Sequence, residues 1–506
     1  MRNILSFLTV LLLAFAAPAQ AEWRQARTDH FILTIDDTEA NAHDFALRLE
    51  RFDTAMRRLY GVADSPDRRA RPIAIYALRA DPFNAACRCP NALGFYQQRA
   101  EGSFIFSLHD PDADKKSKVG SWSSQALLLH EYSHHFTFSS FPIAYPFWFV
   151  EGFAEFNANT SFEPDGSLII GYPANYRAEA VQNGALSSKQ LFDPERYGFN
   201  ENGMDRIYGR GWLLTHFLML NKQREGQLAT YLNAMNKGAL SLDAAGRAFG
   251  DLNKLNAQLD AYRRGKLAAP LRIPPPATEP VVTVTTLPRG QAEMLPVRAQ
   301  ALVGMAKGYW QRVAIPAGRI AAKYPDDAVV QAQWAEVEYR AGRLDRADEA
   351  ADKALKLKPD LVDALVTKGR IATSRAVEAK ATDPAIWTVA RAWLLKANRA
   401  DPNAVMPLYL YYLSFEQAKA KPSAGAIKGL MRAQVLAPES SAVRMSLAQQ
   451  MLLDADPAAA RALLQPLAFA PHRGTGENVP RKVVDLIDAG KIEDAKAAIK
   501  GDEEDD

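Results

Sequence analysis

The sequence predicts an α+β domain followed by an all-α solenoid of helical repeats. Residues 22–268 mix strand-like alternation with the apolar spacing of amphipathic helices, which is typical of α+β domains. Residues 291–500 are rich in alanine and charged side chains, and small residues and prolines recur there at similar steps. Between these parts, residues 269–290 are rich in proline and short β-formers, which predicts a connector.

The N-terminus has the pattern of a secretory signal peptide. Arg2 precedes an uncharged, mainly apolar run over residues 4–17, and the small-residue pattern AQA follows at 19–21. The apolar run is too short to span a bilayer. We therefore expect residues 1–21 to be cleaved and the mature protein to be periplasmic or secreted.

Charge and hydropathy argue against two classes of partner. The chain has 61 basic and 58 acidic residues, so it lacks the electrostatic footprint of a protein that binds nucleic acid or an anionic membrane surface. No segment after the signal peptide is long and apolar enough to cross a bilayer. We expect neither a nucleic-acid partner nor a membrane span after signal cleavage.

The first half of the α+β domain contains predicted strands, a helix and a hairpin. "HFILTIDD" (30–37) and "PIAIYAL" (72–78) run apolar or alternate as strands do. "NAHDFALRLERFDTAMRRLYG" (41–61) has helical spacing. "GFYQQRAEGSFIFSL" (94–108) is interpreted as a hairpin that leads into the next helix.

The two cysteines, Cys87 and Cys89, are separated by one residue. An oxidising compartment permits a disulfide between them, although only a tight turn satisfies that geometry. A two-cysteine metal site is disfavoured because no partner ligands are nearby. The sequence leaves the disulfide open.

Three of the 8 histidines lie in "LLLHEYSHHFTF", residues 127–138. His130, Glu131 and His134 form the pattern H-E-x-x-H, in which positions i and i+4 share one helix face. Two imidazoles so placed can bind one Zn²⁺, and Glu131, roughly 100° round the helix, can reach a water on the metal. The leucines before them predict a buried helix, where polar side chains need a reason to be present.

A second segment supplies a third ligand. "YPFWFVEGFAEF" (145–156) carries Glu151, 17 residues after His134. A structural zinc site uses four protein ligands, whereas a hydrolytic site uses three and leaves the fourth position to water. The sequence therefore predicts a zinc site made of His130, His134 and Glu151.

The order H-E-x-x-H, a loop, then W-x-x-E-G-x-A-E resembles the gluzincin metallopeptidases, most closely the peptidase MA-like group related to aminopeptidase N. The resemblance covers roughly residues 24–262 and implies a zincin-like metallopeptidase domain in which Glu151 is the third ligand. It also implies that "EGSFIFSL" (101–108) is an edge strand able to pair with an extended substrate. The G-A-M-E-N segment that holds a free amine in aminopeptidase N relatives is absent, which favours an endopeptidase.

The resemblance implies two more site residues. Glu155, four residues after Glu151, matches an acid that accepts the N–H of a ligating imidazole in thermolysin-like relatives; the alternative is a solvent-facing glutamate. Tyr208, in "YGRG", resembles the tyrosine of the Y-E-K-G pattern, which stabilises the oxyanion. A core aromatic is the alternative for Tyr208, and Tyr197 is a rival for its role.

Two other histidines are not assigned to the zinc site. His135 projects from a different helix face than His134 and is expected at the surface or in a second layer. His216 lies in an apolar helix and is expected to be a core histidine with its hydrogen bonds satisfied.

The C-terminal part resembles tetratricopeptide repeats in "GRLDRADEAADKALKLKP" (342–359). Prolines follow at intervals of 34, 43, 36 and 33 residues, at Pro325, Pro359, Pro402, Pro438 and Pro471. Alanine pairs stand 12 and 5 residues ahead of three of them, at Ala347 and Ala354, Ala390 and Ala397, and Ala426 and Ala433. Small residues allow helices to cross closely and proline ends the second helix, although chance spacing in an alanine-rich region is the alternative.

The sequence as a whole predicts an exported zinc-dependent peptidase. Glu131 would act as general base and Tyr208 as oxyanion stabiliser, on a protein or peptide substrate, while the repeats bind a protein partner or deliver the substrate. Residues 501–506 are expected to be a solvated acidic tail. The competing hypothesis is a periplasmic repeat scaffold whose metallopeptidase-like domain is inactive.

Overall fold

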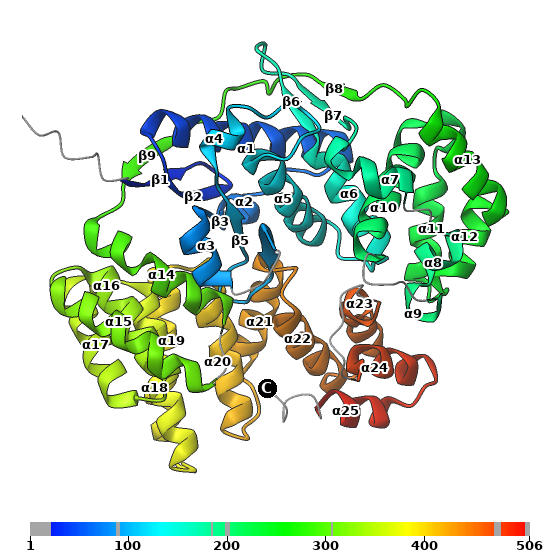
Figure 1. Cartoon of the computed structure of the whole chain (residues 1–506). Coiled ribbons are helices and arrows are strands. Elements are labelled where there is room, and N and C mark those ends of the chain that lie inside the picture. The colour runs from blue at the N-terminus through cyan, green and yellow to red at the C-terminus, as the bar shows by residue number, and fades with distance from the viewer. Residues whose placement is uncertain are drawn as a thin grey trace, which may run out of the picture.

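A computed structural model of the chain describes residues 22–87, 92–183, 186–197, 203–304, 307–469 and 477–500. The predicted signal peptide, Cys89, Pro471 and the acidic tail lie outside these residues, so the disulfide stays untested. The molecule is largely helical, with a small mixed sheet near the N-terminus, and is an α+β part followed by an all-α part (Figure 1). No helix among the described residues has the length and apolar character to cross a membrane.

Two sheets organise the first part. The larger has the strand order β4-β5-β3-β2-β1-β9. The pairs β2–β3 and β3–β5 are parallel, and the other neighbouring pairs are antiparallel. The smaller sheet is antiparallel, with the order β6-β7-β8. The strands are β1 Trp23–Arg27, β2 Phe31–Asp36, β3 Ile73–Leu78, β4 Gly94–Gln97, β5 Phe104–Leu108, β6 Thr160–Phe162, β7 Leu168–Ile170, β8 Leu271–Ile273 and β9 Thr283–Thr286.

Helices pack around the larger sheet, and the helices within residues 147–264 form a second lobe beside it (Figure 1). The prediction of a helix over 41–61 is confirmed by α1, which begins after Thr38, whose side chain accepts the Asn41 amide, and ends at Gly61 with φ 68°. The helices of this part are α1 Glu39–Tyr60, α2 Pro66–Arg69, α3 Ala80–Cys87, α4 Pro111–Asp114, α5 Ser124–Ser140, α6 Phe147–Ala158, α7 Ala178–Asn183, α8 Ser188–Phe192, α9 Pro194–Tyr197, α10 Gly203–Leu220, α11 Gln227–Asn236, α12 Ser241–Phe249 and α13 Leu252–Arg264, with 3₁₀ turns η1 Asn175–Arg177 and η2 Lys222–Arg224.

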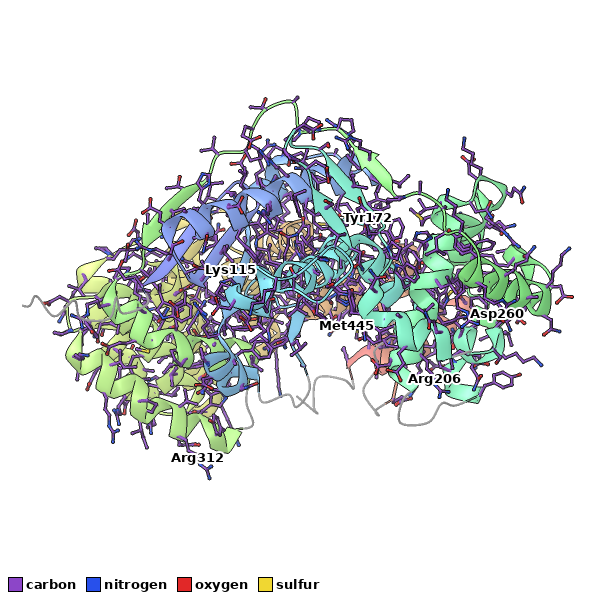
Figure 2. The ribbon with its side chains drawn as sticks, turned by 45° about the horizontal axis from the view of Figure 1, so that its top comes forward. Lys115, Tyr172, Arg206, Asp260, Arg312 and Met445 are labelled. Carbon is purple, nitrogen blue, oxygen red and sulfur yellow. The ribbon has the colours of Figure 1, made fainter. Side chains whose placement is uncertain are left out.

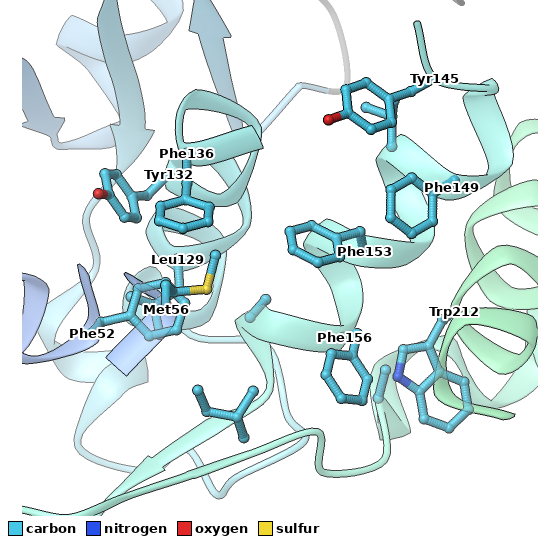
Figure 3. Close-up of a cluster of buried hydrophobic side chains, with 14 of the residues drawn as sticks. Phe52, Met56, Leu129, Tyr132, Phe136, Tyr145, Phe149, Phe153, Phe156 and Trp212 are labelled. Atoms are coloured by element: carbon cyan, nitrogen blue, oxygen red, sulfur yellow. The ribbon is translucent and has the colours of Figure 1, made fainter. Parts of the chain in front are cut away.

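An aromatic core joins the sheet to the second lobe. Figure 3 shows side chains of α1, α5, α6 and α10 gathered in one cluster. Tyr132 and Phe136 of α5 face the sheet side, and Phe153 and Phe156 of α6 continue the cluster toward Trp212 of α10. Burying side chains of this size stabilises by roughly 1.5–3 kcal/mol each, so this core fixes α5 and α6 relative to each other.

The segment 269–290, expected as a connector, contains two strands. β8 extends the small sheet beside β7, and β9 covers the edge of the large sheet beside β1. Valine and threonine residues suit a sheet edge, whereas the prolines of the segment lie outside both strands. The connector is therefore bound to the α+β part along much of its length.

The hairpin predicted over 94–108 is confirmed, but its edge strand is a different one. β5, within the "EGSFIFSL" stretch, lies between β4 and β3, so the edge strand is β4. The prediction of 101–108 as the edge was wrong because β5 is mostly apolar and four of its five residues are buried, as in an inner strand of a sheet.

Helices stacked one on the next form the second part, and Figure 1 shows them curving beneath the α+β part. They are α14 Arg289–Val303, α15 Trp310–Lys323, α16 Ala328–Arg340, α17 Leu344–Leu357, α18 Val362–Glu378, α19 Pro384–Ala400, α20 Val405–Gln417, α21 Ala424–Leu436, α22 Ser441–Leu453, α23 Pro457–Ala468, α24 Val479–Asp488 and α25 Ile492–Lys500, with η3 Lys307–Tyr309.

The predicted roles of alanine and proline in these helices are confirmed for the described residues. All six paired alanines are 0% exposed, as expected where helices cross closely. Pro325, Pro359, Pro402 and Pro438 each follow a helix end by two residues. The longer 43-residue step arises because α18 and α19 are each about one turn longer than α16 and α17, and the loop between them is longer too.

Candidate metal centre

The helix α5 carries three of the predicted site residues. It begins after Ser123, whose hydroxyl accepts the Ala126 amide. Leu128 and Leu129 are 1% exposed and pack into the core, which leaves the opposite helix face to His130 and its neighbours. The buried leucines therefore position the H-E-x-x-H face at the cleft between the sheet and the second lobe.

Two glycines bring α6 and α10 together beside α5. A Cβ added to Gly152 would overlap the backbone of Gly211 and lie 2.7 Å from Thr215 Oγ1. A Cβ on Gly211 would in turn overlap the backbone oxygen of Trp148. This close crossing places Glu151, on α6, and Tyr208, on α10, at the same cleft as α5.

The three predicted zinc ligands converge on one point. His130 Nε2 lies 3.2 Å from His134 Nε2 and 3.3 Å from Glu151 Oε2. His134 Nε2 lies 3.6 Å from the same carboxylate oxygen. Three ligand atoms thus form a nearly equilateral triangle.

This triangle has the dimensions of a tetrahedral zinc site. Bonds of about 2.0–2.1 Å at the tetrahedral angle place ligand atoms about 3.3 Å apart. Two imidazole nitrogens and a carboxylate oxygen are also the donor types that zinc prefers. The residues present therefore fit a zinc ion with a fourth position left for another ligand.

The field at this point is negative. Burial lowers the pKa of His130, but its hydrogen bond to Glu151 and the charges of Glu155 and Glu131 outweigh burial and raise that pKa to about 9. The same carboxylates that stabilise a protonated imidazole would stabilise a divalent cation bound between the ligands.

Glu131 lies beside the triangle, against the edge strand β4. Its pKa is raised to about 7, first by burial and then by the charge of Glu151, while the Tyr96 backbone amide opposes the shift by hydrogen bonding to its carboxylate. A Cβ on Gly94 would lie 3.2 Å from Glu131 Cγ, so glycine allows β4 to approach α5 closely. A carboxyl group with this pKa can take up and release a proton near neutral pH.

Glu155 is 1% exposed, so the solvent-facing alternative is wrong. Its Oε1 lies 3.7 Å from His130 Nδ1, on the side of the ring away from the triangle. Arg177 donates to the same carboxylate from Nε, at 2.9 Å, and from Nη2, at 2.8 Å, and the Tyr176 hydroxyl also donates to it. Glu155 is thus held in place behind a ligand.

Tyr208 lies at the cleft with the ligands, and Tyr197 does not. The Tyr208 ring is 6.1 Å from the His130 ring, and the Arg177 guanidinium sits 4.6 Å above it. Burial, followed by the charges of Glu151 and Glu131, raises the pKa of Tyr208, so its hydroxyl stays a donor. Tyr197 is 38% exposed and faces Lys189.

The two unassigned histidines lie outside the triangle. His216 is 0% exposed and its ring nitrogens contact Tyr262 Oη at 2.9 Å and the Gly171 carbonyl at 3.2 Å, which confirms a satisfied core histidine. His135 Nδ1 lies 3.3 Å from Tyr96 Oη, and burial lowers the pKa of His135 to about 3.

A cavity of about 460 Å³ opens onto the triangle and Tyr208. One wall is the edge strand β4 and α5. The opposite wall comes from the second part of the chain, at Glu439, Ser441, Arg444, Pro466 and Leu467 of α22, α23 and the turn before α22. No sequence motif predicted this wall or Arg177, because both depend on contacts between segments far apart in the sequence, which local patterns do not encode.

Comparisons with known proteins add little to this geometry. No protein-family model matches the sequence, and no curated protein sequence matches it. One solved structure with a similar chain is titled "Functional Characterization of Pseudomonas Aeruginosa pilF"; it is 19% identical, and the match covers 42% of this chain and 90% of that chain with a TM-score of 0.32.

Proposed function

We propose that the protein is an exported zinc-dependent peptidase, and that it cleaves within polypeptides. The observation that supports this proposal is the triangle of His130, His134 and Glu151, whose edges of 3.2, 3.3 and 3.6 Å suit tetrahedral zinc. The resemblance of the motifs around it to gluzincin metallopeptidases supports the same class. The N-terminal signal pattern supports action in the periplasm or outside the cell.

The residues around the triangle have complementary roles in peptide hydrolysis. Bound zinc would supply a water of lowered pKa, about 7, and polarise the scissile carbonyl. Glu131, which lies beside the triangle, accepts a proton from the attacking water and returns it to the departing amine. Tyr208 donates a hydrogen bond to the developing oxyanion. No covalent intermediate is needed.

The cavity suits an extended chain. β4 is the outermost strand of the larger sheet in the described part of the chain, and its residues Gly94–Gln97 line the cavity. An extended peptide can add to such an edge through main-chain hydrogen bonds, which are independent of sequence. The missing free-amine motif and the position of this edge strand beside the cavity together support an endopeptidase.

The test is zinc analysis combined with the variant Glu131→Gln. Wild type and variant are each expected to bind one equivalent of zinc, and the variant to cleave an unfolded protein about 10²–10⁴-fold more slowly because the general base is lost. Zinc content is measured by mass spectrometry and cleavage by the release of peptides. Glu163→Gln, on the β6–β7 turn outside the cavity, is the matched control and should retain full activity.

Two outcomes would contradict the proposal. Wild type that binds no zinc would exclude the metal centre. Zinc-loaded wild type that cleaves no polypeptide would favour the competing hypothesis, a helical-repeat scaffold that keeps a metal site without activity.

A further inference from the structure

The cavity wall supplied by α22 and α23 is fixed to both sides of the cleft. The Ser103 hydroxyl, from the β4–β5 hairpin, donates to Glu439 Oε1 at 2.7 Å. On the other side, Gln465 Nε2 of α23 donates to Asn236 of α11, at 2.5 Å to its backbone oxygen and 2.9 Å to Oδ1. These contacts hold the wall over the cavity, so its side chains are part of the surface that a substrate meets.

Among the described residues that line this cavity, Arg444 is the one lysine or arginine. It lies on α22, next to Met445, which Figure 2 shows near the middle of the molecule. Arg444 is 5% exposed, and its guanidinium donates to two backbone carbonyls, those of Leu463, at 3.3 Å, and of Pro438. No ion pair joins it to a carboxylate anywhere in the described part of the chain.

Arg210 is the arginine of the described chain whose burial is closest to that of Arg444. Arg210, which is 4% exposed, donates to Asp260 Oδ1 at 2.9 Å and so has a carboxylate partner. Burial lowers the pKa of Arg444, and the charge of Glu439 opposes this shift only in part. Buried charges are costly unless they are paired, so Arg444 needs an anion to complete its surroundings.

The position of Arg444 on its helix also favours a bound anion. It is the fourth residue of α22, close to the positive end of the helix dipole, where a cation is disfavoured and an anion is favoured. Ser441, in the same first turn, also lines the cavity. The helix end and the guanidinium therefore attract negative charge to the same wall, opposite the metal ligands.

We propose that Arg444 is a specificity residue that binds a carboxylate of the peptide substrate, across the cavity from the metal centre. This inference rests on the proposed function. The carboxylate can come from an acidic side chain near the scissile bond or from the C-terminus of a short peptide, since both present the same two oxygens to a guanidinium.

Binding to the zinc-loaded Glu131→Gln protein tests this without turnover. The probes are four peptides of one sequence, with Glu or Gln at one position and with a free or an amidated C-terminus. We expect at least one acidic form to bind tenfold or more tightly than its neutral counterpart, because it forms a desolvated ion pair with Arg444. Comparing the two Glu/Gln pairs with the two carboxylate/amide pairs shows whether the bound carboxylate is the acidic side chain or the C-terminus.

Variants at position 444 link this preference to the guanidinium. Added to the Glu131→Gln protein, Arg444→Met should abolish the preference while leaving the affinity for the neutral peptide within about twofold, and Arg444→Lys should keep part of it because the charge remains. Arg461→Gln, which removes an arginine of α23 that is paired with Asp488 of α24, is the control and should change neither affinity. Circular dichroism verifies that each variant is folded. If Arg444→Met unfolds, the peptide preference of Arg444→Lys is compared with that of the parent protein instead.

The outcome separates the subsite from the peptidase. Equal binding of acidic and neutral peptides, or an acidic preference that survives Arg444→Met, would overturn the role of Arg444. Neither result would contradict the peptidase, which is tested separately by zinc content and cleavage. A preference that depends on Arg444 in a protein whose wild type cleaves nothing would support the subsite and reject the peptidase.

Discussion

Glu155 connects the proposed ligand His130 to two residues that no sequence motif marks. Arg177 and Tyr176, in the η1 turn, donate to the Glu155 carboxylate, and that carboxylate faces His130 Nδ1. Arg177 also covers the Tyr208 ring. One buried carboxylate thus lies behind the proposed metal ligand His130, and the arginine beside it packs on the predicted oxyanion donor.

The variant Glu155→Gln tests this orientation at the residue scale. Loss of the negative charge behind His130 should weaken zinc binding about 10–100-fold, because the carboxylate orients the imidazole and raises its basicity. Competition with a chromophoric chelator measures the zinc affinity. Glu163→Gln should leave it unchanged, and an unchanged affinity in Glu155→Gln would mean that Glu155 is only a partner of Arg177.

At the scale of helices, the crossing of α6 and α10 determines whether the site exists at all. Gly152 follows the ligand Glu151 directly, and Gly211 lies three residues after Tyr208. Since neither position has room for a Cβ, the two backbones touch, and this contact sets the separation of the ligand and the tyrosine. The glycine after the third ligand therefore has a packing explanation.

Gly152→Ala should destabilise the protein by about 1–3 kcal/mol, because the helices must move apart to admit a methyl group. Urea unfolding followed by tryptophan fluorescence measures the loss, and zinc affinity should fall with it. Gly246→Ala on α12 is the matched control: nothing lies within 4 Å of its added Cβ, so it should stabilise by about 0.5–1 kcal/mol through helix propensity. Equal effects of the two substitutions would contradict the crossing argument.

Local patterns predicted the elements well, and the assembly of those elements less well. Helical periodicity located α1 and the repeat helices, and the alternation of apolar residues located β2 and β3. The sequence also predicted that His130, His134 and Glu151 act together, and the three side chains lie close together in space. Three features depend on contacts between distant segments, which periodicity does not encode. They are the edge position of β4, the pairing of β8 and β9, and the cavity wall that contains Arg444.

At the scale of the whole molecule, a charged network ties the β4–β5 hairpin to the helical array. Glu101, in the hairpin loop, pairs with Arg370 of α18 at 3.0 Å. Arg340, of α16, lies 3.7 Å from Glu101 and 2.9 Å from Glu336, which also pairs with Arg298 at 3.0 Å. Since β4 borders the cavity, this network and the Ser103–Glu439 contact hold one wall of the site in place through the second part of the chain.

The stability that Glu336 adds to this junction should depend on pH. Burial raises its pKa, but Arg298, Arg340 and Arg370 outweigh burial and lower it from 4.5 to about 2. Its contribution is therefore complete above about pH 4.5 and is lost as the pH falls toward 2. The difference in free energy of unfolding between wild type and Glu336→Gln, measured by urea titration at about pH 7 and about pH 3, should shrink at the lower pH. Glu493→Gln, at a side chain that is 85% exposed, should match wild type at both; a pH-independent difference for Glu336→Gln would show that its carboxylate acts through packing alone.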